Sequence, residues 1–553
     1  MSPTTTAAPQ DYSKETSKTA RNNTVGMLSS PTVAVAQAAL LLAGHAVAQE
    51  CPNYVNYFKQ KHEPLSTGRH ALSYMRPPAE CRTFKSQEVE DAVARVRAAI
   101  ADPDLARIFE NAYPNTLDTA IKWRGTAADN ADEELTFIIT GDINAMWLRD
   151  SANQMQSYLP LLKASDSRDS IASLFRGTIN LHARYLLTSP YCNSFQPPAE
   201  SGIPPAWNDA AREDTVTPRY NSSFVFECKY ELDSLAAFLQ LSHDYHTATG
   251  DAAFFGRFRW ADAVRATLKV ARDMMTGTYG EDGRVLKSAY TFTRITPRGS
   301  ETLTNDGIGN PVANGTGLIR SAFRPSDDVS IYQLFIPANM MFAANLARAA
   351  DIAAKISSGN QAMAGLEAEM RDMAASLRNA INSHGVVPDA TRSGRGDVYA
   401  YEVDGYGSAS LMDDANIPSL LSAPLSGFLD RSDPLYRNTR ALVLGERGFN
   451  SNPYFMRGPV INAVGGPHVR LGYAWPMASI VRILTSDDDI EIKGVLRELV
   501  SSTDGLGLMH EAVNAHNQSD WTRPWFSWAN GLFGQMILDL QERKPEILKE
   551  SFQ

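Results

Sequence analysis

Cysteine and histidine are scarce in this 553-residue chain, which contains four Cys and ten His. The sequence has no CxxC pair, no HExxH segment and no EF-hand loop, the patterns that most often indicate zinc or calcium sites. This scarcity argues against a protein that depends on a bound metal or other cofactor. Asp404 and the adjacent Asp413 and Asp414 are the carboxylates that could still bind calcium.

Clusters of basic residues are also lacking. The formal net charge is −10 and the sequence pI is near 5.6, whereas nucleic-acid binding requires clustered Lys and Arg. We therefore expect no nucleic-acid partner, and a neutral, hydroxyl-rich ligand is the easier fit. The content of 43% hydrophobic and 21% charged residues is ordinary for a folded globular protein and excludes a largely disordered chain.

Long hydrophobic runs are absent apart from residues 29–48, which are interrupted by a proline, a glutamine and a histidine. This stretch is short for the ~20 apolar residues of a membrane-spanning helix, and its small terminal residues are typical of a signal-peptide cleavage site. Residues 1–48 are predicted to be an N-terminal extension and signal peptide, with Met27 as a possible true start, and residues 49–553 a single domain. The mature protein is expected to be secreted, or to act in the secretory pathway, without a membrane anchor; a retained anchor is the alternative.

The four cysteines permit two disulfides in an oxidising compartment. Cys51–Cys81 and Cys192–Cys228 are the local pairings, although four cysteines allow three connectivities and the spacing does not choose among them. Buried free thiols are the alternative, above all for Cys228, which has apolar neighbours.

Strand-like alternation is rare, and residues 135–140 are the best strand candidate. Apolar residues instead recur at the i, i+3/i+4, i+7 spacing of one helix face, and roughly a dozen helices are expected between residues 85 and 545. The clearest segments are 89–100, 155–162, 232–239, 342–353, 366–381, 492–499 and 528–540. The pattern predicts an all-α protein.

A solenoid would repeat every ~34–47 residues, and no such period is present. The long connections are instead unequal and rich in Gly, Pro, Asn and aromatic residues, a composition that favours functional loops on a rigid scaffold. They are residues 189–226, 291–328, 386–414, 450–473 and 505–526. We predict that these loops meet over a central pocket at one end of a closed helical barrel.

Acids, arginines, histidines and tryptophans are concentrated in or beside these loops. The segments are 140–151 (TGDINAMWLRDS), 227–234 (ECKYELDS), 323–328 (FRPSDD), 399–414 (YAYEVDGYGSASLMDD), 465–476 (GGPHVRLGYAWP) and 507–530 (GLMHEAVNAHNQSDWTRPWFSWAN). Carboxylates and Arg bind sugar hydroxyls through charge-assisted hydrogen bonds, and aromatic rings lie against the apolar faces of sugars. Arg149 beside Asp150, and Arg324 near Asp327, would keep these carboxylates ionised. The combination indicates a glycoside hydrolase, which needs one carboxylic acid and one carboxylate.

Taken in order, these motifs resemble glycoside hydrolase family 125, and the resemblance runs from about residue 85 to residue 542. It implies an (α/α)₆ barrel with long active-site loops and exo-acting hydrolysis of terminal α-1,6-linked mannose. It also implies net inversion, no metal, and a mannose-containing oligosaccharide or N-glycan as the substrate.

The resemblance also implies the site residues. The general base falls on Glu511, and the general acid on Asp327 or Asp328, with Asp327 preferred and the other aspartate expected to cap the following helix. In an inverting enzyme the acid and base stand roughly 6.5–9.5 Å apart, with water beside the base. The sugar pocket would draw on Asp142, Trp147, Arg149, Asp150, Glu231, Asp233, Arg324, His468 and Trp475.

Each feature also has a structural explanation. Arg149 and Asp150 could be a buried ion pair that locks two helices, and Glu231 and Asp233 could be a solvated helix face. A lone His468 is more often a hydrogen-bonded core residue than a catalyst. Two other functions remain open: an inverting glycosidase for α-glucosides or trehalose, and a non-catalytic mannan-binding homologue.

Overall fold

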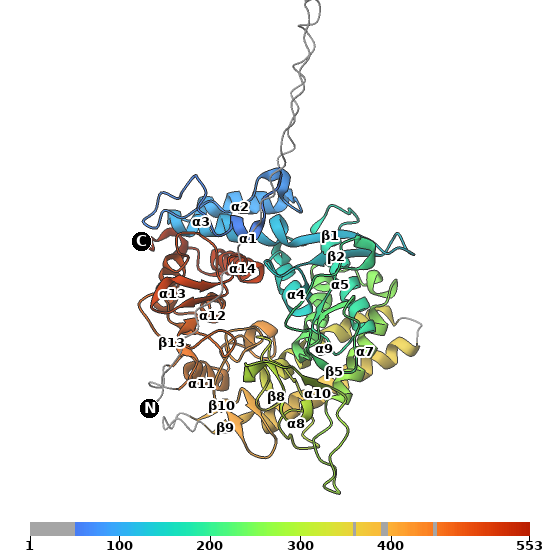
Figure 1. Ribbon diagram of the computed structural model, residues 1–553. Coiled ribbons are helices and arrows are strands. Elements are labelled where there is room, and N and C mark those ends of the chain that lie inside the picture. Colours follow the sequence, from blue (N-terminus) through green and yellow to red (C-terminus); the bar gives the residue numbers. More distant parts are fainter. Residues whose placement is uncertain (1–49, 358–360, 389–395, 446–450) are drawn as a thin grey trace, which may run out of the picture. The chain divides into compact units, whose positions relative to one another are not determined.

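The computed structural model describes residues 50–357, 361–388, 396–445 and 451–553. The predicted signal peptide and Met27 lie outside these residues. Cys51–Gln553 form one compact unit, shown in Figure 1. Among the described residues, no helix combines the length and apolar character needed to cross a membrane.

Five mostly buried helices form the centre of this unit. They are α4 (Leu148–Gln156), α6 (Leu232–Thr249), α9 (Ile336–Ile356), α12 (Pro476–Leu484) and α14 (Ser527–Arg543). Contacts run in series from α12 to α14, α4, α6 and α9, and from α9 to the 3₁₀ turn Ala423–Ser426. Residues from α4, α6, α9, α14 and this turn line one small cavity of about 90 Å³. These elements therefore surround a common centre.

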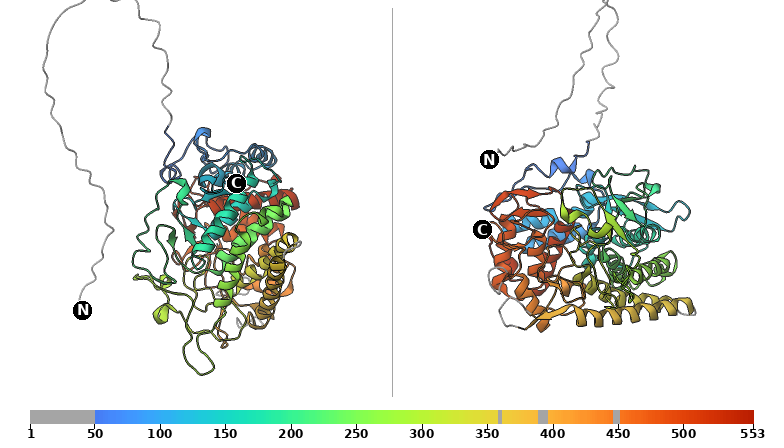
Figure 2. Two further views of the ribbon diagram at one scale, coloured as in Figure 1. Left: turned by 90° about the vertical axis from the view of Figure 1, so that its right-hand side faces the viewer. Right: turned by 60° about the horizontal axis from the view of Figure 1, so that its bottom comes forward.

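A second set of helices packs against the first. It consists of α3 (Pro103–Ala112), α5 (Ile171–Thr188), α7 (Trp260–Asp273), α10 (Gln361–His384) and α13 (Asp489–Ser501). Further helices are α1 (Tyr54–Tyr57), α2 (Gln87–Ala99), α8 (Thr304–Gly307) and α11 (Pro434–Val443). The longest helix of the second set, α10, packs along α9 and is yellow in Figure 2. Buried helix α9 is apolar on almost every face, as expected for a helix enclosed by others.

Helices from the two ends of the unit lie side by side, since α3 contacts both α13 and α14 (Figure 1). Asp102, which caps α3, also accepts hydrogen bonds from the Phe552 backbone N–H at 2.7 Å and from Gln553 Nε2 at 2.6 Å. These bonds hold the C-terminal residues against the start of α3.

In the described parts of the chain, short strands form seven small sheets, of which the all-α prediction anticipated only one strand. The sheets are β1–β2 (Ile121–Thr126, Glu134–Ile138), β3–β4–β6 (Met146–Trp147, Ser194–Phe195, Val225–Glu227), β5–β7 (Thr215–Thr217, Thr291–Thr293), β8–β11–β12 (Leu334–Phe335, Glu402–Val403, Ala409–Ser410), β9–β10 (Val386–Pro388, Asp397–Tyr399), β13–β14 (Phe455–Met456, Ala463–Val464) and β15–β16–β17 (Tyr473–Ala474, Ala512–Asn514, Asn517–Thr522). Many of these strands have only two residues, too few for alternation to register in the sequence.

Local predictions can be compared with these elements. The strand candidate 135–140 is confirmed as β2, which pairs antiparallel with β1. The single helix face predicted over 155–162 is wrong, because α4 ends at Gln156 and a 3₁₀ turn follows at Leu159–Leu161. Pro160 explains the break, because its ring clashes with the carbonyl four residues earlier in an α-helix.

Candidate active site

The predicted site residues lie where the central helices begin. Trp147, Glu231 and Trp475 are the N-cap residues of α4, α6 and α12. Trp147 ends strand β3, while Trp475 directly follows strand β15. Small sheets therefore fix the entry of the chain into the buried helices and hold the motifs at their N-terminal ends. Acidic side chains are favoured there because the helix dipole is positive, as for Asp150 and Asp233 in the first turns.

Arg149 is the centre of a cluster of four carboxylates. Its Nη1 donates to Glu231 Oε2 at 2.5 Å and to Asp233 Oδ2 at 3.3 Å. Its Nη2 lies 3.4 Å from Asp150 Oδ2 and 3.8 Å from Asp327 Oδ1. Glu231 and Asp233 are 1% and 0% exposed, so the solvated-face explanation is wrong.

The four carboxyl groups around the Arg149 guanidinium differ in pKa, and not all of them ionise readily. Burial raises the pKa of Asp150 and of Asp233 to about 6, although Arg149 opposes the rise. Burial also raises the pKa of Glu231 well above its usual range, and Asp327 adds to this. Burial would raise the pKa of Asp327 too, but Arg149, a buried lysine and a hydrogen bond with Glu231 lower it to about 2. Of these two neighbouring carboxyls, Glu231 therefore favours the protonated form and Asp327 favours the charged form.

Asp327 has an unusual backbone conformation, and its side chain is more exposed than that of the adjacent Asp328. Its φ is +64°, a left-handed conformation that Asp tolerates better than most residues. Its Oδ1 accepts hydrogen bonds from Trp147 Nε1 at 3.3 Å and from Asn193 Nδ2 at 3.0 Å. The Asp327 side chain is 20% exposed, whereas that of Asp328 is 2% exposed.

Asp328 instead faces His468. His468 Nδ1 lies 3.3 Å from Asp328 Oδ2, and although burial would lower the pKa of His468, Asp328 raises it to about 9. The expectation that one of the two aspartates caps the next helix is wrong. Helix α9 begins only at Ile336, its N-cap is Phe335, and no side chain caps it.

Arg324 does not pair with Asp327, so that predicted ion pair is also wrong. Its Nε donates to Glu402 Oε1 at 2.7 Å, and both side chains are buried. Glu402 belongs to strand β11, which pairs with β8 just before α9. Ser326 Oγ donates to Asp414 Oδ2 at 2.8 Å, so residues 402–414 hold the FRPSDD loop from one side.

Glu511 lies in a second, separate cluster. Its Oε2 accepts from Thr522 Oγ1 at 3.1 Å, and its Oε1 accepts from Arg523 Nη1 at 3.3 Å. Arg523 also donates through Nε to Asp142 Oδ1 at 2.7 Å and through Nη2 to Thr140 Oγ1 at 3.0 Å. One arginine therefore joins the segments 140–151 and 507–530, which are far apart in the sequence.

Asp150 and His468 connect the two clusters, since each interacts electrostatically with both Asp327 and Glu511. No hydrogen bond joins Asp327 to Glu511 among the described residues. Asp150 Oδ2, Arg324 Nη2 and the indole N–H of Trp475 are buried without a hydrogen-bond partner in the described part of the chain. Buried polar atoms are normally satisfied, so these atoms fit a ligand with several hydroxyl groups.

The structure places all of the predicted residues in these connected clusters, and Trp475 joins them because its ring lies 6.1 Å from the ring of His468. Several residues of the same clusters were not predicted: Asn193, Lys229, Glu402, Asp414 and Arg523. Four of these five are charged residues within the motifs themselves. For Lys229 and Glu402, a charged residue between apolar neighbours in a motif would have been a usable signal.

The carboxylates that could bind calcium are engaged with backbone N–H groups. Asp404 Oδ1 accepts from Tyr406 and Ser408, and Asp413 accepts from Leu420 and Leu421. Within the described ranges, no group of three or more His, Cys, Asp and Glu side chains is arranged to hold a metal ion.

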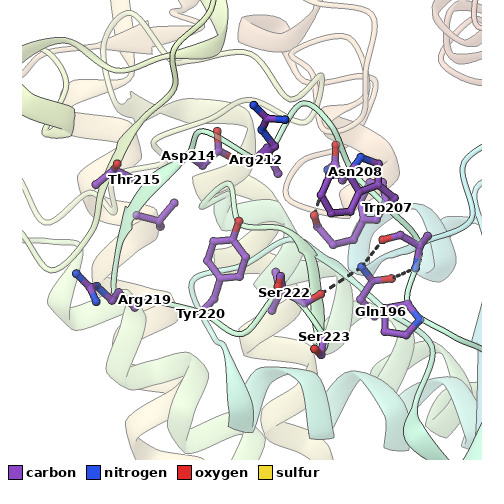
Figure 3. Close-up of a pocket in the computed structure, with 16 residues that line it drawn as sticks. Gln196, Trp207, Asn208, Arg212, Asp214, Thr215, Arg219, Tyr220, Ser222 and Ser223 are labelled. Atoms are coloured by element: carbon purple, nitrogen blue, oxygen red, sulfur yellow. Dashed lines mark hydrogen bonds between the residues drawn. The ribbon is translucent and has the colours of Figure 1, made fainter.

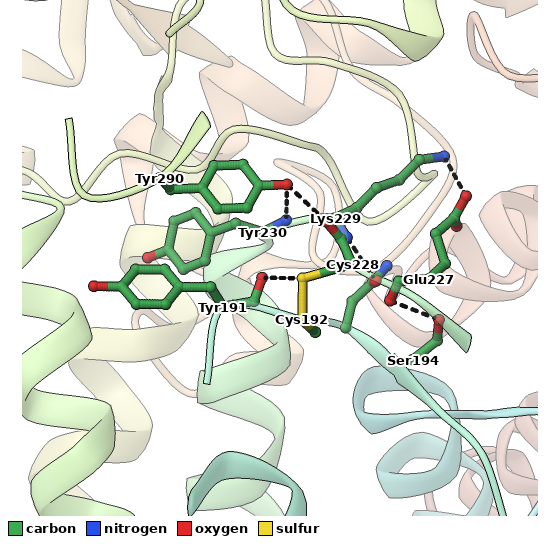
Figure 4. The surroundings of a disulfide bond; sticks show 9 residues. Tyr191, Cys192, Ser194, Glu227, Cys228, Lys229, Tyr230 and Tyr290 are labelled. Carbon is green, nitrogen blue, oxygen red and sulfur yellow. Dashed lines mark hydrogen bonds and ion pairs between the residues drawn. A yellow bond between two sulfur atoms is a disulfide. The ribbon is translucent and has the colours of Figure 1, made fainter. Parts of the chain in front are cut away.

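Both local disulfide pairings are confirmed, and one of them lies at the site. Cys51 pairs with Cys81, and Cys192 with Cys228. Figure 4 shows that the second bond joins the segments that carry Ser194 and Lys229. Asn193, directly after Cys192, accepts from the Lys229 backbone N–H at 3.1 Å and donates to both Glu231 and Asp327.

Removing the site disulfide should therefore affect both stability and activity. For the double variant Cys192→Ser and Cys228→Ser, we expect the free energy of unfolding to fall by about 3–4 kcal/mol, because the unfolded chain loses a cross-link. We also expect kcat/KM to fall, because Asn193 loses its anchor. Urea unfolding and initial rates measure the two effects.

The other disulfide provides the matched control. Cys51 and Cys81 are separated by 30 residues, against 36 for the site pair, so chain entropy predicts a similar loss of stability. Cys51→Ser with Cys81→Ser should leave the kcat/KM of the folded protein nearly unchanged. Equal loss of activity in the two double variants would show that Asn193 does not depend on the disulfide.

The ion pair between His468 and Asp328 predicts a pH-dependent stability. Because folding raises the pKa of His468 from 6.5 to about 9, its contribution is fully present below pH 6.5 and is lost as the pH rises through 9. As the pH rises from 6.5 to 9, the melting temperature of the native protein should fall more than the melting temperature of His468→Gln. The exposed His516, changed to Gln, is the control and should retain the native profile. Identical profiles for native protein and His468→Gln would contradict the ion pair.

Buried carboxylates fixed by two arginines, with indole rings and unsatisfied polar atoms beside them, define a sugar-processing site of the glycoside hydrolase class. Comparison with known proteins identifies the family. The family model described as metal-independent α-mannosidase, glycoside hydrolase family 125, matches residues 102–538. The chain belongs to this family.

Two relatives extend the comparison. The chain is 48% identical to the meiotically up-regulated gene 157 protein of Schizosaccharomyces pombe. The match spans 502 residues and covers 91% of this chain and 94% of that protein. It is also similar, with 30% identity and a TM-score of 0.70, to a solved structure of a metal-independent α-mannosidase from Streptococcus pneumoniae. That structure is a non-productive complex with α-1,6-mannobiose, and the match covers 84% of this chain and all of the other.

Proposed function

We propose that this protein is an exo-acting, inverting α-mannosidase that hydrolyses terminal, non-reducing α-1,6-linked mannose. One observation carries the proposal: two carboxylates, Asp327 and Glu511, lie beside different arginines, and both interact electrostatically with Asp150. Inversion needs two such groups with room for water between the sugar and the base. The mannobiose complex of the Streptococcus pneumoniae relative supports the choice of sugar and linkage.

Glu511 acts as the general base in this proposal. Thr522 and Arg523 hold its two oxygens by hydrogen bonds, which fixes the carboxylate in place. Glu511 accepts one proton from the attacking water while the water oxygen bonds to the anomeric carbon. Arg523 positions this group and also binds Asp142.

Asp327 acts as the general acid, and Glu231 supplies its proton. Asp328 is the weaker candidate, because it is buried and faces a histidine whose pKa is raised to about 9. Asp327 is more exposed and neighbours Glu231, which favours the protonated form. As the glycosidic bond breaks, the proton of Glu231 passes through Asp327 to the leaving oxygen, and Asp327 and Glu231 are left without it.

The central and covering helices support an (α/α)₆ barrel. Five central helices and one 3₁₀ turn give six inner elements in contact in series, and all of them except α12 line a common cavity. Helices α3, α5, α7, α10, α11 and α13 would be the six outer elements of this barrel. The active-site motifs then lie together at the end where the inner helices begin.

The substrate we propose is a mannose-containing oligosaccharide or N-glycan, met in the secretory pathway or outside the cell. Two disulfides fit an oxidising compartment. In such a compartment the Cys192–Cys228 bond can form and cross-link the loops at the site.

Proton NMR of α-1,6-mannobiose hydrolysis tests the proposal. With a chelator present, we expect mannose to be released first as the β-anomer, followed by mutarotation. Initial release of the α-anomer would contradict inversion. Hydrolysis of α-glucosides or trehalose but not of mannobiose would favour a different glycosidase, and binding without mannose release would favour a mannan-binding protein.

A further inference from the structure

A cavity of about 640 Å³ lies outside the carboxylate clusters. It is lined by the long loop between β4 and β6, including Trp207, Arg212, Arg219 and Tyr220, as Figure 3 shows. Its volume falls within the roughly 300–1,000 Å³ typical of ligand sites. It is therefore large enough to receive a small ligand, and nothing in the proposed hydrolysis uses it.

The walls of this cavity are fixed by hydrogen bonds. The buried Gln196 side chain accepts from the Ala206 N–H at 2.8 Å and donates to the Ala206 carbonyl at 2.9 Å and the Ser222 carbonyl at 3.4 Å. The Gln196 backbone N–H donates to the Phe224 carbonyl at 3.0 Å. One glutamine therefore ties the two arms of the loop together, and the cavity is a built feature of the fold.

The lining suits a sugar. The side chain of Trp207 is held by a 2.7 Å hydrogen bond from its Nε1 to Asp209, yet Trp207 is 73% exposed. A fixed, exposed indole offers a flat apolar face for the C–H side of a pyranose. Arg212 and Tyr220, on the same loop, present hydrogen-bonding groups for hydroxyls (Figure 3).

The cavity shares a wall with the carboxylate site. Phe226 lines the cavity, and its ring packs edge-on against Trp147 with 5.6 Å between centroids. Trp147 Nε1 in turn donates to Asp327 Oδ1. The wall therefore lies on the side of the proposed general acid, which is the side from which the leaving group departs.

A buried chain of ion pairs supports the same wall. Asp214, which also lines the cavity, accepts from Arg294 Nε at 2.7 Å, and Arg294 Nη2 donates to Glu227 at 2.6 Å. Lys229 Nζ lies 3.5 Å from Glu227 and interacts electrostatically with Asp327. One network of charged side chains therefore connects Asp214 in the cavity wall with Asp327, the proposed general acid.

We propose that this cavity binds the leaving-group part of a longer mannose oligosaccharide, at sugars beyond the one that is directly attached through the cleaved bond. This inference rests on the proposed function, because it takes Asp327 as the leaving-group side. The enzyme then discriminates a multi-sugar substrate from a disaccharide, which is too short to reach Trp207.

The test compares two substrates in two variants. For Trp207→Ala we expect kcat/KM for an α-1,6-linked mannopentaose to fall about tenfold, which corresponds to the loss of one aromatic contact. The kcat/KM for α-1,6-mannobiose should not change. Because Trp207 is exposed, folding should be unaffected, and an unchanged melting temperature checks this. Ile490→Ala, which removes another exposed apolar side chain, at 82% exposure on α13, is the matched control.

Calorimetric titration separates binding from catalysis. In Glu511→Gln, the added change Trp207→Ala should weaken mannopentaose binding about tenfold and leave mannobiose binding unchanged. Equal effects on both substrates, or no effect on either, would overturn the cavity assignment. If the native protein releases mannose from neither substrate, the proposed function itself is wrong, and titration with mannopentaose still reports whether the cavity binds it.

Discussion

Replacing Glu511 with glutamine is expected to lower kcat for α-1,6-mannobiose about 10³–10⁴-fold, within the range of general base catalysis. The amide keeps the shape of the side chain but cannot accept a proton from water. Because the loss concerns the transition state, the dissociation constant for mannobiose should change little. Rates of mannose release and calorimetric titration measure the two quantities.

Azide provides a chemical test of the same role. In Glu511→Ala, azide can enter the space of the missing carboxylate and attack the anomeric carbon without losing a proton. With an activated α-mannoside, we expect β-mannosyl azide and a partial recovery of rate. Formation of the α-azide, or no rescue with an intact melting profile, would count against a base on the inverting face. The exposed Glu542, changed to Gln, should retain full activity.

The sequence was a good guide to which segments meet but a poor guide to how their side chains pair. Motifs around Asp150, Glu231, Asp327, His468 and Glu511 predicted one site, and the structure brings them together. The periodic apolar residues beside these motifs also predicted the central helices, because a helix that buries one face has a regular apolar pattern in its sequence. Both kinds of signal are local.

Which side chains pair with one another depends on tertiary geometry and produces no local pattern in the sequence. Arg324 was expected beside Asp327, three residues away, but binds Glu402, which lies 78 residues later. Arg523 was not selected at all, although it connects Glu511 with Asp142. The short sheets share this property, since two-residue strands owe their existence to the partner strand rather than to their own sequence.

The left-handed backbone of Asp327 is a further feature that the sequence could not reveal. Asp tolerates this conformation at a cost of about 1 kcal/mol, and the surrounding loop must hold it. Such strain is commonly kept at functional sites. Here it separates two adjacent aspartates, so that Asp327 faces Trp147 and Asp328 faces His468.

That separation leads to the second large expected effect. Asp327→Asn should lower kcat/KM for α-1,6-mannobiose about 10²–10⁴-fold, because a sugar leaving group needs a proton. The same variant should lose far less on 2,4-dinitrophenyl α-mannoside, whose leaving group departs as a stable anion. Steady-state rates on the two substrates give the comparison.

Asp328→Asn is the matched variant, one residue away and of the same chemistry. If Asp328 only positions His468, its loss should reduce the rates on both mannosides by a similar factor, whatever the leaving group. The reverse pattern, with leaving-group dependence in Asp328→Asn and not in Asp327→Asn, would move the acid to Asp328. Because Glu231 supplies the proton of Asp327 in the proposed mechanism, Glu231→Gln should resemble Asp327→Asn in its leaving-group dependence. This result would link the buried carboxylate cluster to the acid step.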